Sequence, residues 1–234
     1  MPASSQNVPA DRSPLDRSPL HQRIYETLRA EVISGQRKPG ELLSEAELAR
    51  SWGVSRSPIR EAFRQLEQHD LVRWAPRRGA TVARLTVAGL RDIFEVREAL
   101  EALSAGLAAE RGSAADLAKM RDLAVDIKKS QDEGDYMRAI MLDDEFHRLM
   151  ASTTRNRTLE SQSGHVLDRV IMARLVVREE PGRTEEIVRE HQAILDALGQ
   201  RDAERAAEQA ALHVRNARVR LMDMLQRASV DPED

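Results

Sequence analysis

Four ionisable side chains in the second half of the chain have the types and spacing of a metal site. Asp143 and His147 lie one helical turn apart on a stripe that is otherwise apolar, and His191 and His213 each interrupt another apolar stripe. Burying imidazoles and a carboxylate without partners would cost several kcal/mol. Neutral imidazole nitrogens and a carboxylate oxygen suit Zn²⁺, Ni²⁺, Mn²⁺ or Fe²⁺, so the pattern predicts a divalent transition metal in a helical core.

Other interpretations of these four residues stay open. A single histidine on an apolar face is more often a hydrogen-bonded core residue than a ligand. A metal with open positions can also activate water, which would make the chain a metal-dependent hydrolase or lyase with a helix-turn-helix appendage. Glu145, the nearest general base, lies two residues from His147 and should point elsewhere. The metal could also be purely structural. The remaining histidines lack such a stripe and are expected to be structural or exposed: His21, His69 and His165.

Arginines at helical spacing form a second chemically informative group nearer the N-terminus. Arg56, Arg60 and Arg64 are four residues apart and therefore share one helix face. The guanidinium fork suits paired hydrogen bonds to guanine, and Ser55 and Ser57 at the start of the same helix can bind phosphates. This face is predicted to enter the major groove of double-stranded DNA.

The elements that position these arginines are three helices and a hairpin. Helices are expected over residues 20–34, after Ser44 and from near Ser57, and Gly53 breaks the second from the third. This layout is a helix-turn-helix. Two short strands around the turn Arg77-Arg78-Gly79 would add a basic wing against a minor groove or phosphates.

The rest of the chain shows helical patterns without strand signals. Helices are expected to begin at Thr86, Ser113, Asp135, Asn156, Thr184 and Asp202. The predicted fold class is mainly α, with an N-terminal winged helix-turn-helix and a C-terminal antiparallel all-α bundle of about six helices.

Charge divides the chain in the same place. The whole chain carries 36 Lys and Arg against 39 Asp and Glu, a net charge of -3. Residues 21–84 hold 12 basic and 8 acidic side chains, whereas residues 85–234 hold 22 and 29. A basic module suited to DNA is thus joined to an acidic one.

The absence of cysteine excludes disulfides, Fe–S clusters and thiolate metal sites. No segment approaches the roughly 20 apolar residues of a membrane span, and no apolar signal stretch opens the chain. We therefore expect a cytoplasmic protein without a membrane partner.

The N-terminal module resembles the winged helix-turn-helix of GntR-family transcriptional regulators. The resemblance rests on the runs Pro39-Gly40-Glu41-Leu42-Leu43-Ser44-Glu45, Gly53-Val54-Ser55-Arg56-Ser57-Pro58-Ile59-Arg60-Glu61-Ala62 and Arg78-Gly79-Ala80-Thr81-Val82. It implies that Ser55, Arg56, Ser57 and Arg60 contact operator DNA and that Gly79 marks the wing tip. Ala46 departs from relatives that carry an arginine there, which puts a contact at that position in doubt.

The C-terminal half resembles the FCD effector-binding domain of the FadR-like GntR branch. Matching features are Val96-Arg97-Glu98-Ala99-Leu100-Glu101, Asp143 and His147 with Phe146 between them, the Glu190-His191 pair and His213. The resemblance implies that Asp143, His147, His191 and His213 hold the metal, and six helices favour the smaller, VanR-like arrangement.

Such domains commonly bind small carboxylates at the metal. Arg97, Arg169 and Arg174 are candidates to clamp such an acid, although each is equally suited to an ordinary salt bridge. The expected domains are a disordered arm over residues 1–19, a DNA-binding domain over 20–84 and an effector-binding and dimerisation domain over 85–230. The leading hypothesis is a homodimeric regulator, a repressor, whose affinity for a two-fold operator changes when a small organic acid binds.

Overall fold

The computed structural model describes residues 18–75, 78–176 and 184–227. Internal contacts divide the chain into two compact units that meet in sequence between Arg84 and Leu85. Of the expected N-terminal arm, only residues 18 and 19 are among the described residues, and the expected wing residue Arg77 lies outside them.

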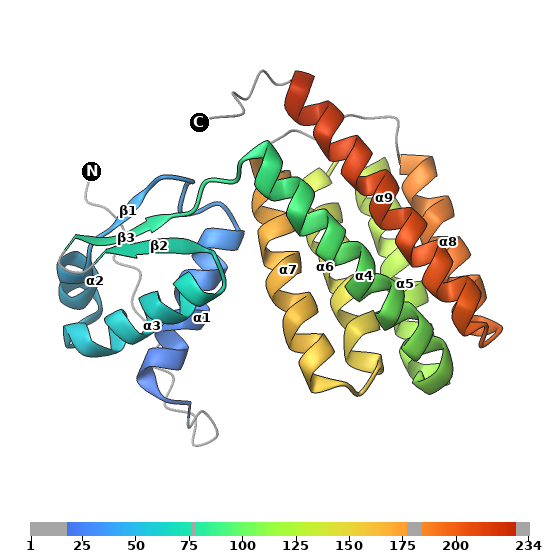
Figure 1. Ribbon diagram of the computed structural model, residues 1–234, viewed down its shortest axis with the longest axis horizontal. Helices are drawn as coiled ribbons and strands as arrows, with labels where there is room; N and C mark the ends of the chain where they lie inside the picture. Colours follow the sequence, from blue (N-terminus) through green and yellow to red (C-terminus); the bar gives the residue numbers. More distant parts are fainter. Residues whose placement is uncertain (1–17, 76–77, 177–183, 228–234) are drawn as a thin grey trace. The chain divides into compact units, whose positions relative to one another are not determined.

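The N-terminal unit is a three-helix module with a small antiparallel sheet (Figure 1). The sheet has the strand order β1-β3-β2. Its elements are α1 (Leu20–Ile33), β1 (Leu42–Leu43), α2 (Glu45–Trp52), α3 (Arg56–Gln68), β2 (Val72–Ala75) and β3 (Gly79–Val82). The predicted helices and hairpin are confirmed, and the structure adds the strand β1, which pairs Leu43 with Ala80. Two residues are too few for an alternating pattern, so the sequence carried no signal for this strand.

Local chemistry explains how α3 is set against α2. The Ser44 side chain accepts a hydrogen bond from the backbone N–H of Glu47 and caps α2, which ends at Gly53 in the left-handed region with φ 65°. The apolar face of α3 is completely buried through Ile59, Phe63 and Leu66. Burial of that face leaves the opposite, arginine-bearing face in solvent.

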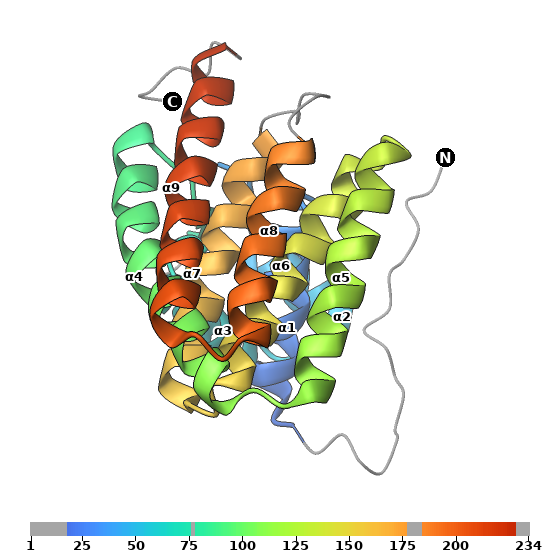
Figure 2. The ribbon, with the colours of Figure 1, turned by 90° about the vertical axis from the view of Figure 1, so that its right-hand side faces the viewer.

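The second unit is a bundle of six helices among the described residues, which run side by side in Figure 2. They are α4 (Val87–Arg111), α5 (Ala114–Asp132), α6 (Tyr136–Thr153), α7 (Arg157–Val176), α8 (Thr184–Gly199) and α9 (Ala203–Arg227). The predicted helix starts are confirmed within a residue or two, because Thr86, Ser113 and Asp135 each cap a helix with a side-chain oxygen.

Two apolar clusters form the core of the bundle. One joins α4, α5, α6, α8 and α9 around Phe146 and Met150, and the other joins α4, α7 and α9 around Phe94 and Leu221. The predicted stripes of α6, α8 and α9 all face this core, which carries their polar interruptions inside with them. No helix within the described ranges is long and apolar enough to cross a bilayer.

Candidate metal centre and nucleic-acid interface

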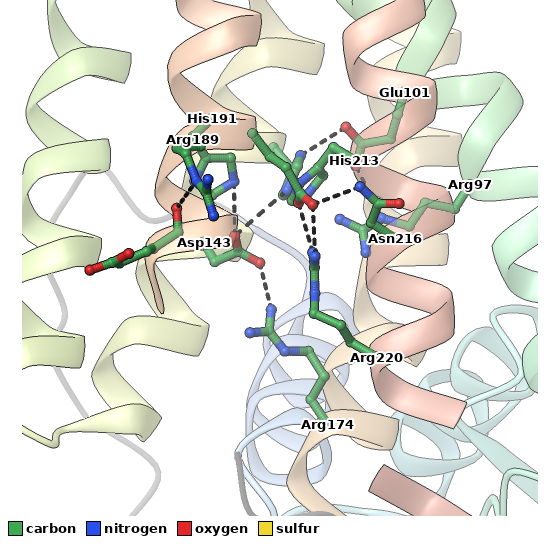
Figure 3. A network of polar contacts seen from close by, with 12 residues as sticks. Arg97, Glu101, Asp143, Arg174, Arg189, His191, His213, Asn216 and Arg220 are labelled. Carbon is green, nitrogen blue, oxygen red and sulfur yellow. Dashed lines mark hydrogen bonds and ion pairs between the residues drawn. The ribbon is translucent and has the colours of Figure 1, made fainter. Parts of the chain in front are cut away.

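The four predicted ligands converge inside the bundle. Asp143 and His147 come from α6, His191 from α8 and His213 from α9, and all four are buried. One possible ligand atom from each lies within 4.8 Å of the others. Figure 3 shows Asp143 between His191 and the guanidinium of Arg174. Helix periodicity thus predicted a set of side chains that only bundle packing brings together.

Two carboxylates that the sequence analysis did not assign orient the imidazoles. Glu101 lies 2.8 Å from Nδ1 of His147, and Glu190 lies 2.8 Å from Nδ1 of His213. Burial alone would raise the pKa of Glu101, but the charges of His147 and Arg97 outweigh it and lower the pKa to about 2. Because Glu101 is ionised at neutral pH, it can only accept a hydrogen bond, so Nδ1 of His147 donates and Nε2 is left on the side of Asp143.

Glu190 acts on His213 in the same way. Burial opposes ionisation here too, but the hydrogen bonds from His213 and Arg220 lower the pKa of Glu190 to about 2. Burial lowers the pKa of His213 to about 3 despite its bond to Glu190, so His213 is neutral at physiological pH. Neutral imidazole with Nδ1–H on a carboxylate is the form in which histidine binds metals through Nε2.

The donor set fits a divalent transition metal. In the part of the chain that the structure describes, Nε2 of His147 and Nε2 of His191 are buried without a hydrogen-bond partner. Oδ1 of Asp143 lies 3.2 Å from Nε2 of His191 and 3.8 Å from Nε2 of His147. The ion pair to His191 is close in distance, but it does not meet the geometry of a hydrogen bond. A cation among these buried nitrogens and the carboxylate oxygen would give each of them a partner.

Asp143 is ionised and therefore available as an anionic ligand. Burial favours its neutral form, but the Arg174 guanidinium, 2.5 Å away, and the close imidazole of His191 hold its pKa well below the usual range. The second oxygen of Asp143 is the one bound by Arg174, which leaves Oδ1 toward the histidines.

A cavity of about 60 Å³ lies beside this cluster. Two of the predicted effector arginines, Arg97 and Arg174, line it together with Asp143 and His213, whereas Arg169 is not among its lining residues. The cavity also has an apolar part of its lining, which includes Phe94, Val170, Ile187, Leu221 and Met224.

Arg220 is a third cavity arginine, which the sequence analysis missed. Its terminal nitrogens donate to both oxygens of Glu190 at 2.7 and 2.8 Å, and Asn216 donates to the same carboxylate. Arg220 lies seven residues after His213 on α9, so its helical spacing could have placed both on one face. Arg97 has a comparable partner in Glu101, at 3.1 Å.

The predicted DNA-binding face of α3 is open to solvent. Ser55, Arg56, Ser57, Arg60 and Arg64 are all exposed. Nε of Arg60 donates to the buried carboxylate of Glu45, and the guanidinium of Arg64 lies 5.3 Å from the centre of the Trp74 ring. The arginine row is therefore both exposed and partly oriented.

At the wing, Arg78 is exposed, whereas Gly79 is buried at the start of β3. Gly79 has a φ of 98°, and a Cβ added there would lie 2.3 Å from the carbonyl oxygen of Leu43. Close strand packing thus requires glycine at this position, independently of any approach of DNA.

The remaining histidines have simpler surroundings. Nδ1 of His69 lies 2.8 Å from the Tyr25 hydroxyl, and His21 pairs with Glu61 at 3.5 Å near the surface. Glu145, the candidate general base, is exposed on α6, whereas its neighbours Phe146 and His147 are buried. Glu145 therefore does not lie beside the cluster.

Family models match both units. Residues 20–82 match the bacterial regulatory proteins of the gntR family, and residues 92–216 match the FCD domain. The chain belongs to the GntR family of transcriptional regulators and carries an FCD domain.

Individual relatives agree with this assignment. The chain is 31% identical to the uncharacterised HTH-type transcriptional regulator YdhC of Bacillus subtilis strain 168, over 84% of this chain and 88% of that protein. It is 30% identical to the HTH-type transcriptional repressor RspR of Escherichia coli K12, over 80% and 82% of the two chains. The solved structure of E. coli McbR/YncC has the same fold, with a TM-score of 0.77 at 24% identity, over 88% of this chain and 98% of that one.

Proposed function

We propose that this regulator is a homodimeric repressor whose operator affinity is controlled by a divalent transition metal and a small carboxylic acid bound in the helical bundle. The observation that carries the proposal is the convergence of four buried ligand atoms within 4.8 Å, next to a cavity lined by arginines. The repressor assignment draws on the similarity to RspR.

The DNA-binding part of the proposal rests on α3 and the wing. Arg56, Arg60 and Arg64 would contact base edges and phosphates in a major groove, Ser55 and Ser57 would contact phosphates, and Arg78 would reach the backbone beside the wing. A two-fold dimer would present two such helices to an imperfect palindrome.

In the bundle, Asp143, His147, His191 and His213 would hold the metal. The ion would supply positive charge to an anionic ligand. Glu101 and Glu190 would keep the imidazoles in the metal-binding tautomer, as such carboxylates do in other metal sites.

Charge balance favours an anionic effector that depends on the metal. Each cavity arginine already has a carboxylate partner: Arg97 with Glu101, Arg174 with Asp143, and Arg220 with Glu190. The three pairs cancel, so neutral imidazoles and a divalent cation would leave the site positively charged. A carboxylate would neutralise that excess in a partly apolar environment where charge is costly.

Cavity size favours a compact acid. At about 10–15 Å³ for each water-sized position, a cavity of about 60 Å³ has room for about four to six such groups. The apolar wall would accommodate a short hydrocarbon body better than a chain of hydroxyl groups.

Metal titration tests the centre. Calorimetry with Zn²⁺ and Mn²⁺ should show one site per chain in the wild type and a large loss of affinity in His191→Ala. His165→Ala, which alters a half-buried histidine of the same bundle, serves as the control. Equal metal binding by all three proteins would refute the metal assignment.

Ligand and DNA assays test the control of transcription. With metal-loaded protein, acetate and lactate should bind and change the affinity for the DNA upstream of the gene, whereas gluconate should not. The Arg56→Ala/Arg60→Ala double variant should no longer bind that DNA. Unchanged DNA binding by the double variant would overturn the proposal that α3 reads DNA. If the acids still change DNA affinity after the metal is removed, the proposal that the effector depends on the metal is wrong.

A further inference from the structure

One hydrogen-bonded network joins α2, the recognition helix α3 and the wing strand β2. At its centre is Glu45, the first residue of α2, which is only 7% exposed. Its Oε2 accepts from Nε of Arg60 at 2.8 Å, and its Oε1 accepts from the indole Nε1 of Trp74 at 3.2 Å. Both oxygens of a buried carboxylate are therefore used to tie a recognition arginine to the wing.

Trp74 is itself held by α3. Its backbone N–H donates to Oε1 of Glu67 at 2.9 Å, and its ring lies beneath the guanidinium of Arg64 at 5.3 Å. A cation over an indole face is attracted by the ring quadrupole. Trp74 thus contacts Arg64 directly and is linked to Arg60 by their shared hydrogen-bond acceptor, Glu45.

We propose that Glu45 and Trp74 are positioning residues for DNA reading, which orient Arg60 and Arg64 before DNA binds. Glu45 engages only Nε of Arg60, and no other hydrogen bond to this guanidinium occurs among the described residues. The two terminal nitrogens, which would pair with O6 and N7 of a guanine, stay available on a side chain that is 46% exposed.

Restriction of the side chain before binding explains how this arrangement raises specificity. A flexible arginine loses rotamer freedom when it binds a base, whereas an arginine already held in position loses less. A fixed guanidinium also tolerates a displaced or incorrect base poorly, because hydrogen bonds weaken steeply with angle. The inference rests on the proposed contact of Arg60 with DNA.

Glu45→Gln is the sharpest variant, because glutamine has one acceptor oxygen where glutamate has two. The variant must therefore release either Arg60 or Trp74 while it keeps the shape of the side chain. Glu47→Gln is the matched control, since it removes the same charge from an exposed position on the same helix. Trp74→Phe keeps a ring under Arg64 but removes the indole donor.

The measurement compares affinities for two DNA duplexes by fluorescence anisotropy with the full-length chain. One duplex is selected from random sequences by the wild-type protein, and the other is an unselected duplex of equal length. Glu45→Gln should lower the affinity ratio of the two by about tenfold, and Trp74→Phe by about two- to threefold. Glu47→Gln should leave the ratio unchanged.

A double-variant cycle separates positioning from a general structural role. In an Arg60→Ala background, Glu45→Gln should lower the ratio no further if it acts through Arg60. An unchanged ratio in Glu45→Gln, or the same loss with Arg60 absent, would overturn the inference. If Arg60→Ala alone has no effect, the proposed DNA contact fails as well, which distinguishes the two failures.

Fluorescence melting guards against misfolded variants. Trp52 and Trp74 are the two tryptophans of the chain and both lie in the N-terminal unit, so their emission reports on its folding. If Glu45→Gln melts far below the wild type, the cycle is run with Trp74→Phe and Arg60→Ala. Independent effects of those two substitutions would then refute the network.

Discussion

Arginine is used in opposite ways by the two units. In the bundle, Arg97, Arg174 and Arg220 are largely buried, and each pairs with a carboxylate inside the site. On α3 the arginine row is exposed, and within the described residues only Arg60 of that row bonds a carboxylate. Buried charges must be paired, whereas exposed guanidiniums keep donors for a partner. The first arrangement lines a cavity inside the protein, and the second leaves guanidinium donors available on the surface.

The largest expected effect concerns a buried pair. Glu101→Leu would leave Arg97 without a partner at a position that is 3% exposed, and we expect a loss of about 3–5 kcal/mol in the free energy of unfolding. Glu98→Leu, which breaks the surface pair with Arg215, should cost about 1 kcal/mol or less. Urea unfolding followed by far-UV circular dichroism measures both. Equal losses would break the distinction between buried and exposed pairs.

The bundle should also carry a pH dependence. In metal-free protein, burial lowers the pKa of His213 from 6.5 to about 3. Between these values the unfolded chain binds a proton that the folded chain does not, so this stability is full above pH 6.5 and is lost as the pH falls through the window. By pH 4.5 the loss is on the order of 2–3 kcal/mol.

Urea unfolding at several pH values above 4.5 measures this dependence and keeps Glu101 and Glu190 ionised. His213→Gln should flatten the profile, whereas the tryptophan signal of the N-terminal unit should not follow it. A profile that is equally steep in His213→Gln would assign the pH dependence to other groups.

Metal affinity should depend on the carboxylate behind a ligand. Glu190→Gln weakens the acceptor for Nδ1 of His213, and we expect metal to bind about 10–100-fold more weakly. Glu186→Gln, an exposed change one turn away on α8, should leave metal affinity unchanged. Calorimetric titration with Zn²⁺ measures both, and equal affinities in the two variants would remove Glu190 from the site.

In the DNA-binding unit, removing an arginine should affect binding without affecting stability. Arg56 is exposed and its side chain makes no hydrogen bond or ion pair within the described residues, so Arg56→Ala should weaken operator binding by about tenfold with an unchanged melting temperature. Arg138→Ala removes the same charge from the surface of α6 and should have no effect on either property. A lower melting temperature in Arg56→Ala would show that Arg56 contributes to the stability of the fold and would contradict this prediction.

Helix capping should give the smallest difference between the units. Ser113 and Asp116 form a reciprocal capping box at the start of α5, whereas Ser44 caps α2 through one bond of 3.4 Å. Ser113→Ala should cost about 1 kcal/mol, and Ser44→Ala less. Thermal unfolding, read by circular dichroism for the first and by tryptophan emission for the second, compares them.

Much of the molecule follows from local patterns. Caps and glycines placed the helix starts, and helical spacing put Asp143 and His147 on one buried face and the α3 arginines on an exposed one. The strand β1 was missed because its two residues pair with β3, which is distant in sequence. Gly79, read from the sequence as a wing tip, also proves necessary for the approach of Leu43.

The sequence by itself determined which residues each helix turns inward, and hence the four candidate ligands. Only the tertiary structure decided the partners of the candidate residues. It placed Glu101 and Glu190 behind the imidazoles and Arg220 in the cavity, and in the N-terminal unit it placed Glu45 behind Arg60. The physical reason is that periodicity relates residues on one helix, whereas the partner across a packed interface depends on how separate helices are placed against one another.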